Sequence, residues 1–421
     1  MTTFELASAL ITLAALLAWV NHRYVRLPPT IGVMVLSMLF SLVLVGIEGF
    51  GLGASEHVQR LMLDVDFSGT LLNGMLGALL FAGALHLNLN DLREKKLAIS
   101  VLATVGVLLS TAVVGAGALL IFRGLGLDVP IVYCFLFGAL ISPTDPIAVG
   151  AILKTAGVSD SLQVKISGES LFNDGVGVVL FILILEVATG GSGHGSEAGG
   201  SQGLMAILNL VAVEVGGGLL FGFVVGWLVY RLLSSVDNYQ VEVLLTLAIA
   251  TGGYSLAHAL HVSGPLAMVV AGLLIGNHGR VFAMSPEVVE HMYGFWELVD
   301  ELLNAVLFVF IGLEVLVLDL NTPVLVAGLA AIPLVLLARF ASVGLPVSLI
   351  RRFVAFSPHA VKILTWSGLR GGISVALALS LPPGPVRDIL VTVTYVVVVF
   401  SIVVQGLTVG PAARRLAGAQ S

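Results

Sequence analysis

The chain has 421 residues, of which 58% are hydrophobic and only 10% are charged, and its formal net charge is −6. A soluble domain carries about 25% charged residues, so this composition excludes an ordinary soluble protein. The few basic residues are spread over short segments, which argues against nucleic-acid binding, and the single Cys134 excludes a disulfide bond within the chain. Apolar runs of about 20 residues, the length that crosses the hydrocarbon core of a bilayer, recur throughout.

These runs predict an all-α polytopic membrane protein with about 13 transmembrane helices, because a β-barrel would show short segments of alternating hydrophobicity instead. The whole chain, 1–421, is expected to form one transmembrane domain. In chain order the predicted spans are residues 4–21, 30–47, 69–88, 97–122, 130–154, 162–187, 204–232, 239–260, 263–277, 292–317, 322–350, 359–381 and 386–411.

The distribution of Lys and Arg predicts the orientation of these spans. With the N-terminus outside, 14 basic residues fall in inner segments, three fall in outer loops and two fall inside spans. Such an asymmetry is the positive-inside signature of membrane proteins. We therefore expect a multi-pass protein of the cell (inner) membrane, with its N-terminus outside and its C-terminus in the cytoplasm.

The fifth predicted span is interrupted by the sequence SPTDP. Pro143 and Pro146 remove backbone donors and disfavour a continuous helix. Asp145 can cap a helix that begins after it, where a negative charge is favoured. The carbonyls freed near Thr144 can face a bound cation. A direct contact between Asp145 and the ion is the alternative.

The twelfth predicted span is interrupted in a similar way by GLRGG, which contains Arg370. Its glycines permit an unwound backbone, and we expect Arg370 to form an ion pair with Asp145. The alternative is that Arg370 reaches only backbone carbonyls. The two interruptions lie seven spans apart, so the second copy is inverted in the membrane, which indicates a transport site. The predicted parts are a first repeat over about 1–187, a linker helix over about 204–232 and a second repeat over about 239–411.

The sixth predicted span carries the strongest chemical pattern, SGESLFNDGVGVV. Ser170 and Asp174 are four residues apart, as are Glu169 and Asn173, so each pair shares a helix face. Hard cations prefer oxygen ligands. Asp174 and Ser170 are therefore predicted to supply two oxygen ligands for a cation, and Thr144 or its carbonyl can supply a third. Because burial disfavours the charged form of a carboxylate, Asp174 is expected to hold either a proton or a cation.

Two further groups of charged residues complete the predicted site. Glu169 is expected to pair with Arg339, because an unpaired Arg within a span is costly; otherwise Glu169 is a second titrating group. Asp300 and Glu301 lie where the tenth span begins on the inner side, and two interpretations stay open for them. They form either a solvated helix face or an acidic entrance that concentrates cations. Asn304 follows one turn deeper in the membrane. His258 and His261 are not expected to bind metal, since no acidic neighbour precedes or follows them closely.

Four segments resemble the signature segments of the cation:proton antiporter-1 family, the NhaP and NHE type of Na⁺/H⁺ exchanger. They are SPTDPIAVGAILK, GESLFNDGVGVVLF, FWELVDELLNAVLFVFIGLE and GLRGGISVALALSLP, and the likeness extends from about Leu79 to Leu381. The resemblance implies 13 helices in two inverted six-helix repeats, a homodimer with a mobile core domain, and elevator-like alternating access. It also implies that Asp174 carries Na⁺ and H⁺ in turn, that Asn173 orders the site, and that Thr144 and Ser170 contribute ligands.

One position departs from this resemblance. Some archaeal and eukaryotic members carry an acidic residue in the third span, where LLFAGALHLNL has Ala82. A ligand from the third span is therefore not expected here, and the chain looks bacterial.

The predicted function is secondary antiport of Na⁺ or Li⁺ against H⁺ at one carboxylate site. In the family that the chain resembles, an Asn–Asp pair such as Asn173 and Asp174 is associated with electroneutral exchange. Exchange of K⁺ is the first alternative, and a cation channel the second. An intramembrane aspartyl protease needs two facing aspartates, a part that Asp145 and Asp174 could play. Because Asp145 lies between two prolines and has Arg370 as its candidate partner, no enzyme activity is expected. No cofactor is expected either, and the expected partners are the lipid bilayer and a second copy of the chain.

Overall fold

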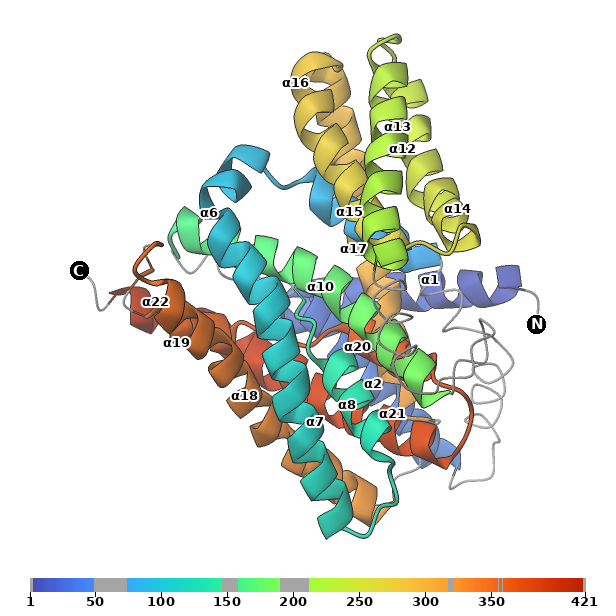
Figure 1. Ribbon diagram of the computed structural model, residues 1–421. Helices are drawn as coiled ribbons and strands as arrows, with labels where there is room; N and C mark the ends of the chain where they lie inside the picture. The colour runs from blue at the N-terminus through green and yellow to red at the C-terminus, as the bar shows by residue number, and fades with distance from the viewer. Residues whose placement is uncertain are drawn as a thin grey trace.

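The computed structural model describes residues 3–48, 74–145, 158–189, 212–316, 321–354, 356–357 and 359–418. All regular structure in these ranges is helical (Figure 1), which confirms the predicted fold class. Seven of the described helices are long and apolar enough to cross a membrane, or up to eight if a strongly bent pair forms one span. The total of thirteen spans, the inverted repeats and the orientation of the termini stay predictions.

The bent pair consists of α1 (Thr3–Val20) and α2 (Pro29–Glu48), whose axes differ by 107°. A short wider-wound segment, η1 (Asn21–Val25), ends at Arg26, which has a positive φ of 61°. The Asn21 side chain donates to the carbonyl of Leu27 at 3.0 Å and accepts from its amide at 3.2 Å. These bonds satisfy the backbone where the helix stops, as hydrocarbon surroundings require.

The third and fourth predicted spans correspond to α5 (Leu76–Leu85) and to one long segment, residues 89–124. The long segment consists of α6 (Leu89–Val101), η3 (Leu102–Gly106) and α7 (Val107–Gly124). Helix α5 packs mainly on α15, whereas α6 packs on α10. The connection between α5 and α6 therefore passes from one group of helices to another (Figure 1).

Two buried helices carry the polar segments singled out above. Helix α8 (Ile131–Ile141) packs against α7 and α10 (Asp160–Ala188). Almost every residue of α8 is apolar, as expected for a helix that is buried on all sides. Gly138 allows the close approach of α7, because a side chain there would overlap the carbonyl of Thr111. These contacts fix the end of α8 beside α10.

A second group of helices stands apart at the top of Figure 1. Its members are η4 (Ala212–Gly217), α12 (Gly218–Leu233), α13 (Tyr239–Ala248), η5 (Ile249–Gly253), α14 (Tyr254–Ala259), α15 (Gly264–Leu274), η6 (Ile275–Gly279) and α16 (Arg280–Phe282). Gly222 and Gly226 of α12 lie against Ala267 and Ala271 of α15. Small residues four apart on both helices let the backbones meet closely, the usual packing mode in membranes.

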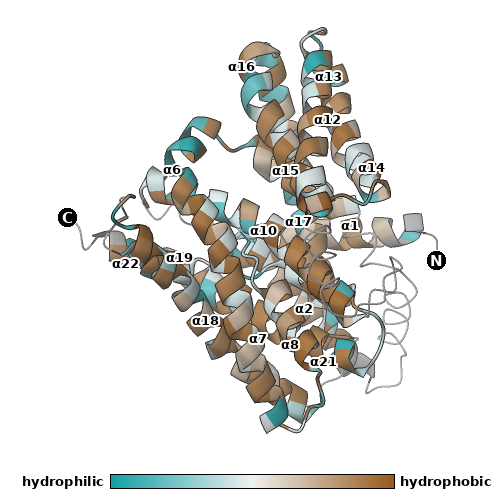
Figure 2. Ribbon diagram, in the orientation of Figure 1, coloured by the Kyte–Doolittle hydropathy of each residue, from teal (hydrophilic) through white to brown (hydrophobic). Residues whose placement is uncertain are grey.

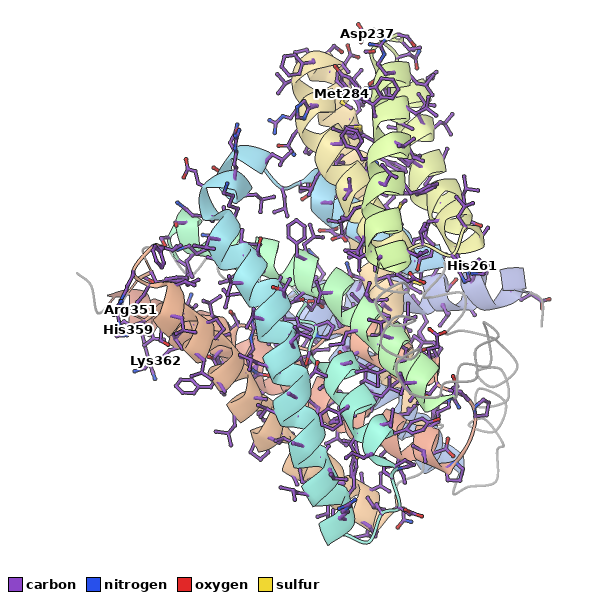
Figure 3. The ribbon with its side chains drawn as sticks, viewed as in Figure 1. Asp237, His261, Met284, Arg351, His359 and Lys362 are labelled. Carbon is purple, nitrogen blue, oxygen red and sulfur yellow. The ribbon has the colours of Figure 1, made fainter. Side chains whose placement is uncertain are left out.

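The remaining helices complete the body that surrounds α8 and α10. They are α17 (Pro286–Glu314), α18 (Thr322–Ile350), α19 (Ala360–Trp366), α20 (Gly372–Leu379), α21 (Pro385–Phe400), η7 (Ser401–Gln405) and α22 (Gly406–Gly418). Helix α17 packs on α2 and on α5, and α5 in turn packs on α15 of the second group. Helix α17 therefore connects the body around α8 and α10 to that group. Figure 2 shows hydrophobic residues along α7, α8 and α18, with hydrophilic ones at the start of α6. Figure 3 shows Arg351, His359 and Lys362 together where α18 leads into α19.

Candidate ion-binding site

The first interrupted helix ends as the sequence predicts. Helix α8 stops at Ile141, and residues 142–145 have no helical structure. The Ser142 hydroxyl donates to the carbonyl of Gly138 at 2.6 Å and lies 2.8 Å from the hydroxyl of Ser110 on α7. Both serines are buried. The break is therefore held by hydrogen bonds inside the protein; the continuation of the span, from residue 146, lies outside the described residues.

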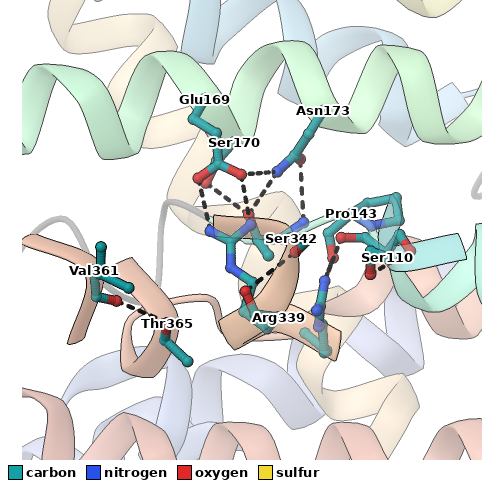
Figure 4. Close-up of polar contacts among 12 residues, drawn as sticks. Ser110, Pro143, Glu169, Ser170, Asn173, Arg339, Ser342, Val361 and Thr365 are labelled. Carbon is teal, nitrogen blue, oxygen red and sulfur yellow. Dashed lines mark hydrogen bonds and ion pairs between the residues drawn. The ribbon is translucent and has the colours of Figure 1, made fainter. Parts of the chain in front are cut away.

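Thr144 joins this break to α10 through three hydrogen bonds. Figure 4 shows Glu169, Ser170 and Asn173 extending from the same side of α10. Its amide donates to Asn173 Oδ1 at 3.2 Å, and its hydroxyl accepts from Asn173 Nδ2 at 2.8 Å. The Thr144 and Ser170 hydroxyls are 3.0 Å apart. Three of the four residues predicted to hold the ion, Thr144, Ser170 and Asn173, are thus brought together. Asn173 orients the threonine through both ends of its amide.

Glu169 and Arg339 form the predicted ion pair. Arg339 Nη1 and Nη2 donate to Glu169 Oε1 and Oε2, each at 2.7 Å. The two side chains are buried, with exposed fractions of 6% for Arg339 and 0% for Glu169. Glu169 Oε1 also accepts from Asn173 Nδ2 at 2.9 Å. The carboxylate is therefore engaged by both a guanidinium and an amide, and its bond to Asn173 connects the pair to the Thr144 cluster.

Arg370 extends from the second break, between α19 and α20, toward the end of α8. Its Nη1 donates to the carbonyls of Ser142 and of Pro143, the latter at 2.9 Å. Its backbone amide donates to the Ser401 hydroxyl at 2.9 Å. A positive charge at the C-terminus of a helix is favoured by the helix dipole. The contacts found are those of the alternative reading, in which Arg370 reaches carbonyls, and the ion pair with Asp145 stays a prediction.

Asp145 lies in turn against the start of α20. Its amide donates to the carbonyl of Leu369 at 2.8 Å. A side chain added at Gly371 would place its Cβ 2.5 Å from Asp145 Oδ2. The carboxylate therefore touches the backbone at the N-terminus of α20, where the dipole favours negative charge. Arg370, from the second interrupted helix, thus stabilises the C-terminal end of α8, and Asp145, from the first, stabilises the N-terminal end of α20.

Asp174 is buried over the first break without a fixed polar partner. Its exposed fraction is 4%, and it has no hydrogen bond or ion pair within the part of the chain that the structure describes. On α10 it lies between Ser170, which contacts Thr144, and Gly177, where an added side chain would overlap Pro143. Residues spaced by three and four share a helix face, so Asp174 faces the segment around residues 143–145.

The charges around Asp174 leave one negative charge uncompensated. Asp145, Glu169 and Arg370 all act on Asp174 electrostatically, and Arg339 neutralises Glu169. Three carboxylates and two guanidiniums sum to −1. A single proton or a single monovalent cation makes the group neutral, which matters because an isolated charge is expensive in a low-dielectric interior.

The residues of the predicted entrance lie along one stretch of α17. Glu301 is exposed, Asp300 is partly buried and Asn304 is 2% exposed. Asn304 Nδ2 donates to the carbonyl of Asp300 at 2.8 Å, while Asp300 Oδ1 is buried with no hydrogen-bond partner among the described residues. Asp145 acts electrostatically on Asp300. These residues therefore form a polar series from the surface toward the crossing of the two breaks.

Sequence reasoning missed two polar contributors. Ser401 accepts from the Arg370 amide and donates to Gln405 at 2.7 Å; the signal was a polar pair four residues apart in the apolar run VVVVFSIVVQG. His258 and His261 both act electrostatically on Glu214, which is distant from them in the sequence. No group of three or more potential metal ligands is found among the described residues.

The fold and site define a helical membrane protein with a buried carboxylate between two interrupted, crossing helices. Residues 10–415 match the family model described as sodium/hydrogen exchanger, transmembrane. The chain belongs to this family. The confirmed membership agrees with the resemblance of the four signature segments.

Individual relatives are similar over most of their length. The Na⁺/H⁺ antiporter NhaP of Pseudomonas aeruginosa is 48% identical over 421 residues, covering 99% of this chain and 97% of the relative. The Na⁺/H⁺ antiporter NhaH of Halobacillus dabanensis is 35% identical over 86% of this chain and 87% of its own. The solved structure of the sodium proton antiporter MjNhaP1 from Methanocaldococcus jannaschii matches with a TM-score of 0.76 at 18% identity, covering 99% and 98% of the chains. This last likeness supports the fold.

Proposed function

We propose that this protein is a secondary antiporter that exchanges Na⁺ or Li⁺ for H⁺ by alternating access at Asp174. The observation that carries the proposal is a nearly fully buried carboxylate, without a hydrogen-bond or ion-pair partner among the described residues, beside the oxygen-rich cluster of Thr144 and Ser170. A cation that binds there gains oxygen ligands of the kind that Na⁺ accepts, and a proton removes the charge instead. The names of the relatives, NhaP and NhaH antiporters, support the same activity.

The net charge of the site supports electroneutral, one-for-one exchange. Asp145, Glu169 and Asp174 carry three negative charges, and Arg339 and Arg370 carry two positive ones. The group is neutral with one Na⁺ bound and equally neutral with one H⁺ bound. Because both loaded states then carry the same charge across the membrane, the membrane potential does no net work on the exchange.

K⁺ is the alternative substrate, since neither the charge balance nor the donor atoms distinguish it from Na⁺. The channel alternative has less support. A channel needs a continuous path for ions, whereas a single buried carboxylate beside two interrupted helices favours occlusion of the ion.

Ions would reach the site along α17. We infer that Asp300 and Glu301 attract cations from the cytoplasm and that Asn304 lies on the way to Asp145. Residence in the cell (inner) membrane with the N-terminus outside, assembly as a homodimer, and the absence of enzyme activity belong to the same proposal. They rest on the distribution of basic residues and on the family.

Transport in proteoliposomes with an imposed pH step tests the proposal. Wild type should show proton flux that depends on Na⁺ or Li⁺, and Asp174→Asn should abolish it. Asp388→Asn, which alters an exposed carboxylate on α21, serves as the matched control and should retain activity. Sodium-driven proton flux that survives in Asp174→Asn would reject the proposal. Addition of K⁺ measures its competition, and a clamped membrane potential tests electroneutrality.

A further inference from the structure

A cavity of about 520 Å³ lies away from the ion site, where the connection between α5 and α6 meets α15, α16 and α17. Its volume falls in the range of small-molecule sites, about 300–1,000 Å³. The residues that line it are His86, Leu87, Asn88, Leu89, Asn90, Gly276, Asn277, His278, Arg280, Val281, Phe282 and Tyr293. This lining contains an arginine, two histidines and three asparagines but no acidic residue.

Arg280 supplies the fixed positive charge of this cavity. Its guanidinium lies 5.4 Å from the centre of the Tyr293 ring, a cation–π distance. The Tyr293 hydroxyl is held in turn, since it donates to the carbonyl of Gly276 at 2.9 Å. Arg280 is nevertheless exposed, so its donors remain accessible to a ligand. The aromatic ring limits the positions that the guanidinium can take.

The N-terminus of α6 forms another wall of the cavity. Asn88 caps this helix of 13 residues, accepting from the amide of Asn90 at 2.9 Å. The Asn277 side chain accepts from the amide of Leu89 at 2.7 Å and donates to the carbonyl of Leu87 at 2.9 Å. The loop before the helix is therefore rigidly placed, and the positive end of the helix dipole points toward the cavity.

His86 adds a hydrogen-bonding group. Its ring packs edge-on against Tyr293 with 5.2 Å between centres. The imidazole can donate a hydrogen bond to a ligand in the cavity. Arg280 is the group whose removal should matter most, because it carries the fixed positive charge.

We propose that this cavity binds a phosphate group, carried either by an anionic lipid headgroup or by a free phosphate. A guanidinium and side-chain hydrogen-bond donors that line one space, with no carboxylate among the lining residues and the positive end of a helix dipole beside them, match a phosphate anion. The rim supports the lipid as the source. Val281 and Phe282 border the cavity with exposed fractions of 69% and 70%, and apolar side chains of this kind can lie among acyl chains beside a headgroup.

A ligand here would act on the connection between two groups of helices. Helix α5 packs on α15 and helix α6 packs on α10, which carries Asp174. The cavity is lined by the residues that join α5 to α6 and by the end of α15 to α16. A bound phosphate therefore connects α6, which packs on the helix that carries Asp174, to the second group of helices, which contains α15 and α16.

Thermal unfolding of the full-length protein tests the proposal without reference to transport. The protein in a non-ionic detergent is titrated with inorganic phosphate, with chloride salt at matched ionic strength as the reference. In a second arm it is placed in nanodiscs of zwitterionic phosphatidylcholine, with or without phosphatidylglycerol. A shift with inorganic phosphate assigns the site to the free anion, and a shift with phosphatidylglycerol alone assigns it to the headgroup. Both results support a phosphate site.

Variants decide whether any shift comes from this cavity. Arg280→Gln should weaken binding by about tenfold to a hundredfold, the worth of one or two charge-assisted hydrogen bonds, and Arg280→Lys should weaken it less. Arg231→Gln is the matched control, because Arg231 also ends a helix with its guanidinium 5.8 Å from an aromatic ring but does not line the cavity. No shift in either arm, or a shift in Arg280→Gln equal to that of wild type, overturns the proposal.

Discussion

Removal of one partner from the Glu169–Arg339 pair should destabilise the protein strongly. The two bonds of 2.7 Å join side chains with exposed fractions of 0% and 6%. Glu169→Gln leaves the guanidinium buried without a counter-charge, and breaking a buried pair in this way typically costs about 3–5 kcal/mol in free energy of unfolding. The amide oxygen still accepts from one nitrogen, so we expect about 3 kcal/mol.

A double-mutant cycle measures this coupling. Unfolding of wild type, Glu169→Gln, Arg339→Gln and the double variant is compared in the same detergent. The double variant should be less destabilised than the sum of the single changes, because neither charge remains alone. The pair Glu94–Lys95, at 3.2 Å with Glu94 largely exposed, is the internal control, and Glu94→Gln should cost under about 1 kcal/mol. Equal costs for Glu169→Gln and Glu94→Gln, or strict additivity in the cycle, would refute the reasoning.

Three further variants test the crossing and the ligand cluster. Arg370→Lys keeps the positive charge but loses the guanidinium geometry that reaches two carbonyls. In the same unfolding assay it should lower the free energy of unfolding by about 1.5–3 kcal/mol, the contribution of one charge-assisted hydrogen bond. Gly177→Ala should slow transport in proteoliposomes because its methyl group overlaps Pro143, whereas Gly294→Ala, with open space around it, should be neutral or stabilising by up to about 1 kcal/mol. Thr144→Ala should raise the KM for Na⁺ more than it lowers kcat; an unchanged KM would contradict a ligand role.

The charged residues of the site could be predicted from sequence because their number is small. Arg339 and Arg370 are the only basic residues that lie more than a few positions from the end of a predicted span, and each must find compensation in hydrocarbon. The pairing of Glu169 with Arg339 followed from that requirement alone. The partners of Arg370 could not be predicted in this way, because the carbonyls at a helix end and a nearby carboxylate are equally suitable partners for a guanidinium. Only the path of the backbone at Ser142 and Pro143 distinguishes them.

Other features depend on contacts that no local pattern encodes. The 107° bend after α1 requires the side chain of Asn21 to bond both the amide and the carbonyl of Leu27, and an asparagine at a span end has many other uses. The wider-wound segments η3 and η5 interrupt spans that read as uniform apolar runs. The bounds of α1, α2 and α18 agree with the predicted spans to within one residue, whereas α6 and α17 begin eight and six residues before the predicted starts.

The exchange of charges between the two interrupted helices restricts how the protein can move. If α8 slid past α19 and α20, Arg370 would leave the carbonyls of Ser142 and Pro143, and Asp145 would leave the backbone at Gly371. Two helix ends and two ionised side chains would then be stripped of compensation in a medium without water. A displacement that keeps both compensations therefore moves the crossing as one rigid body.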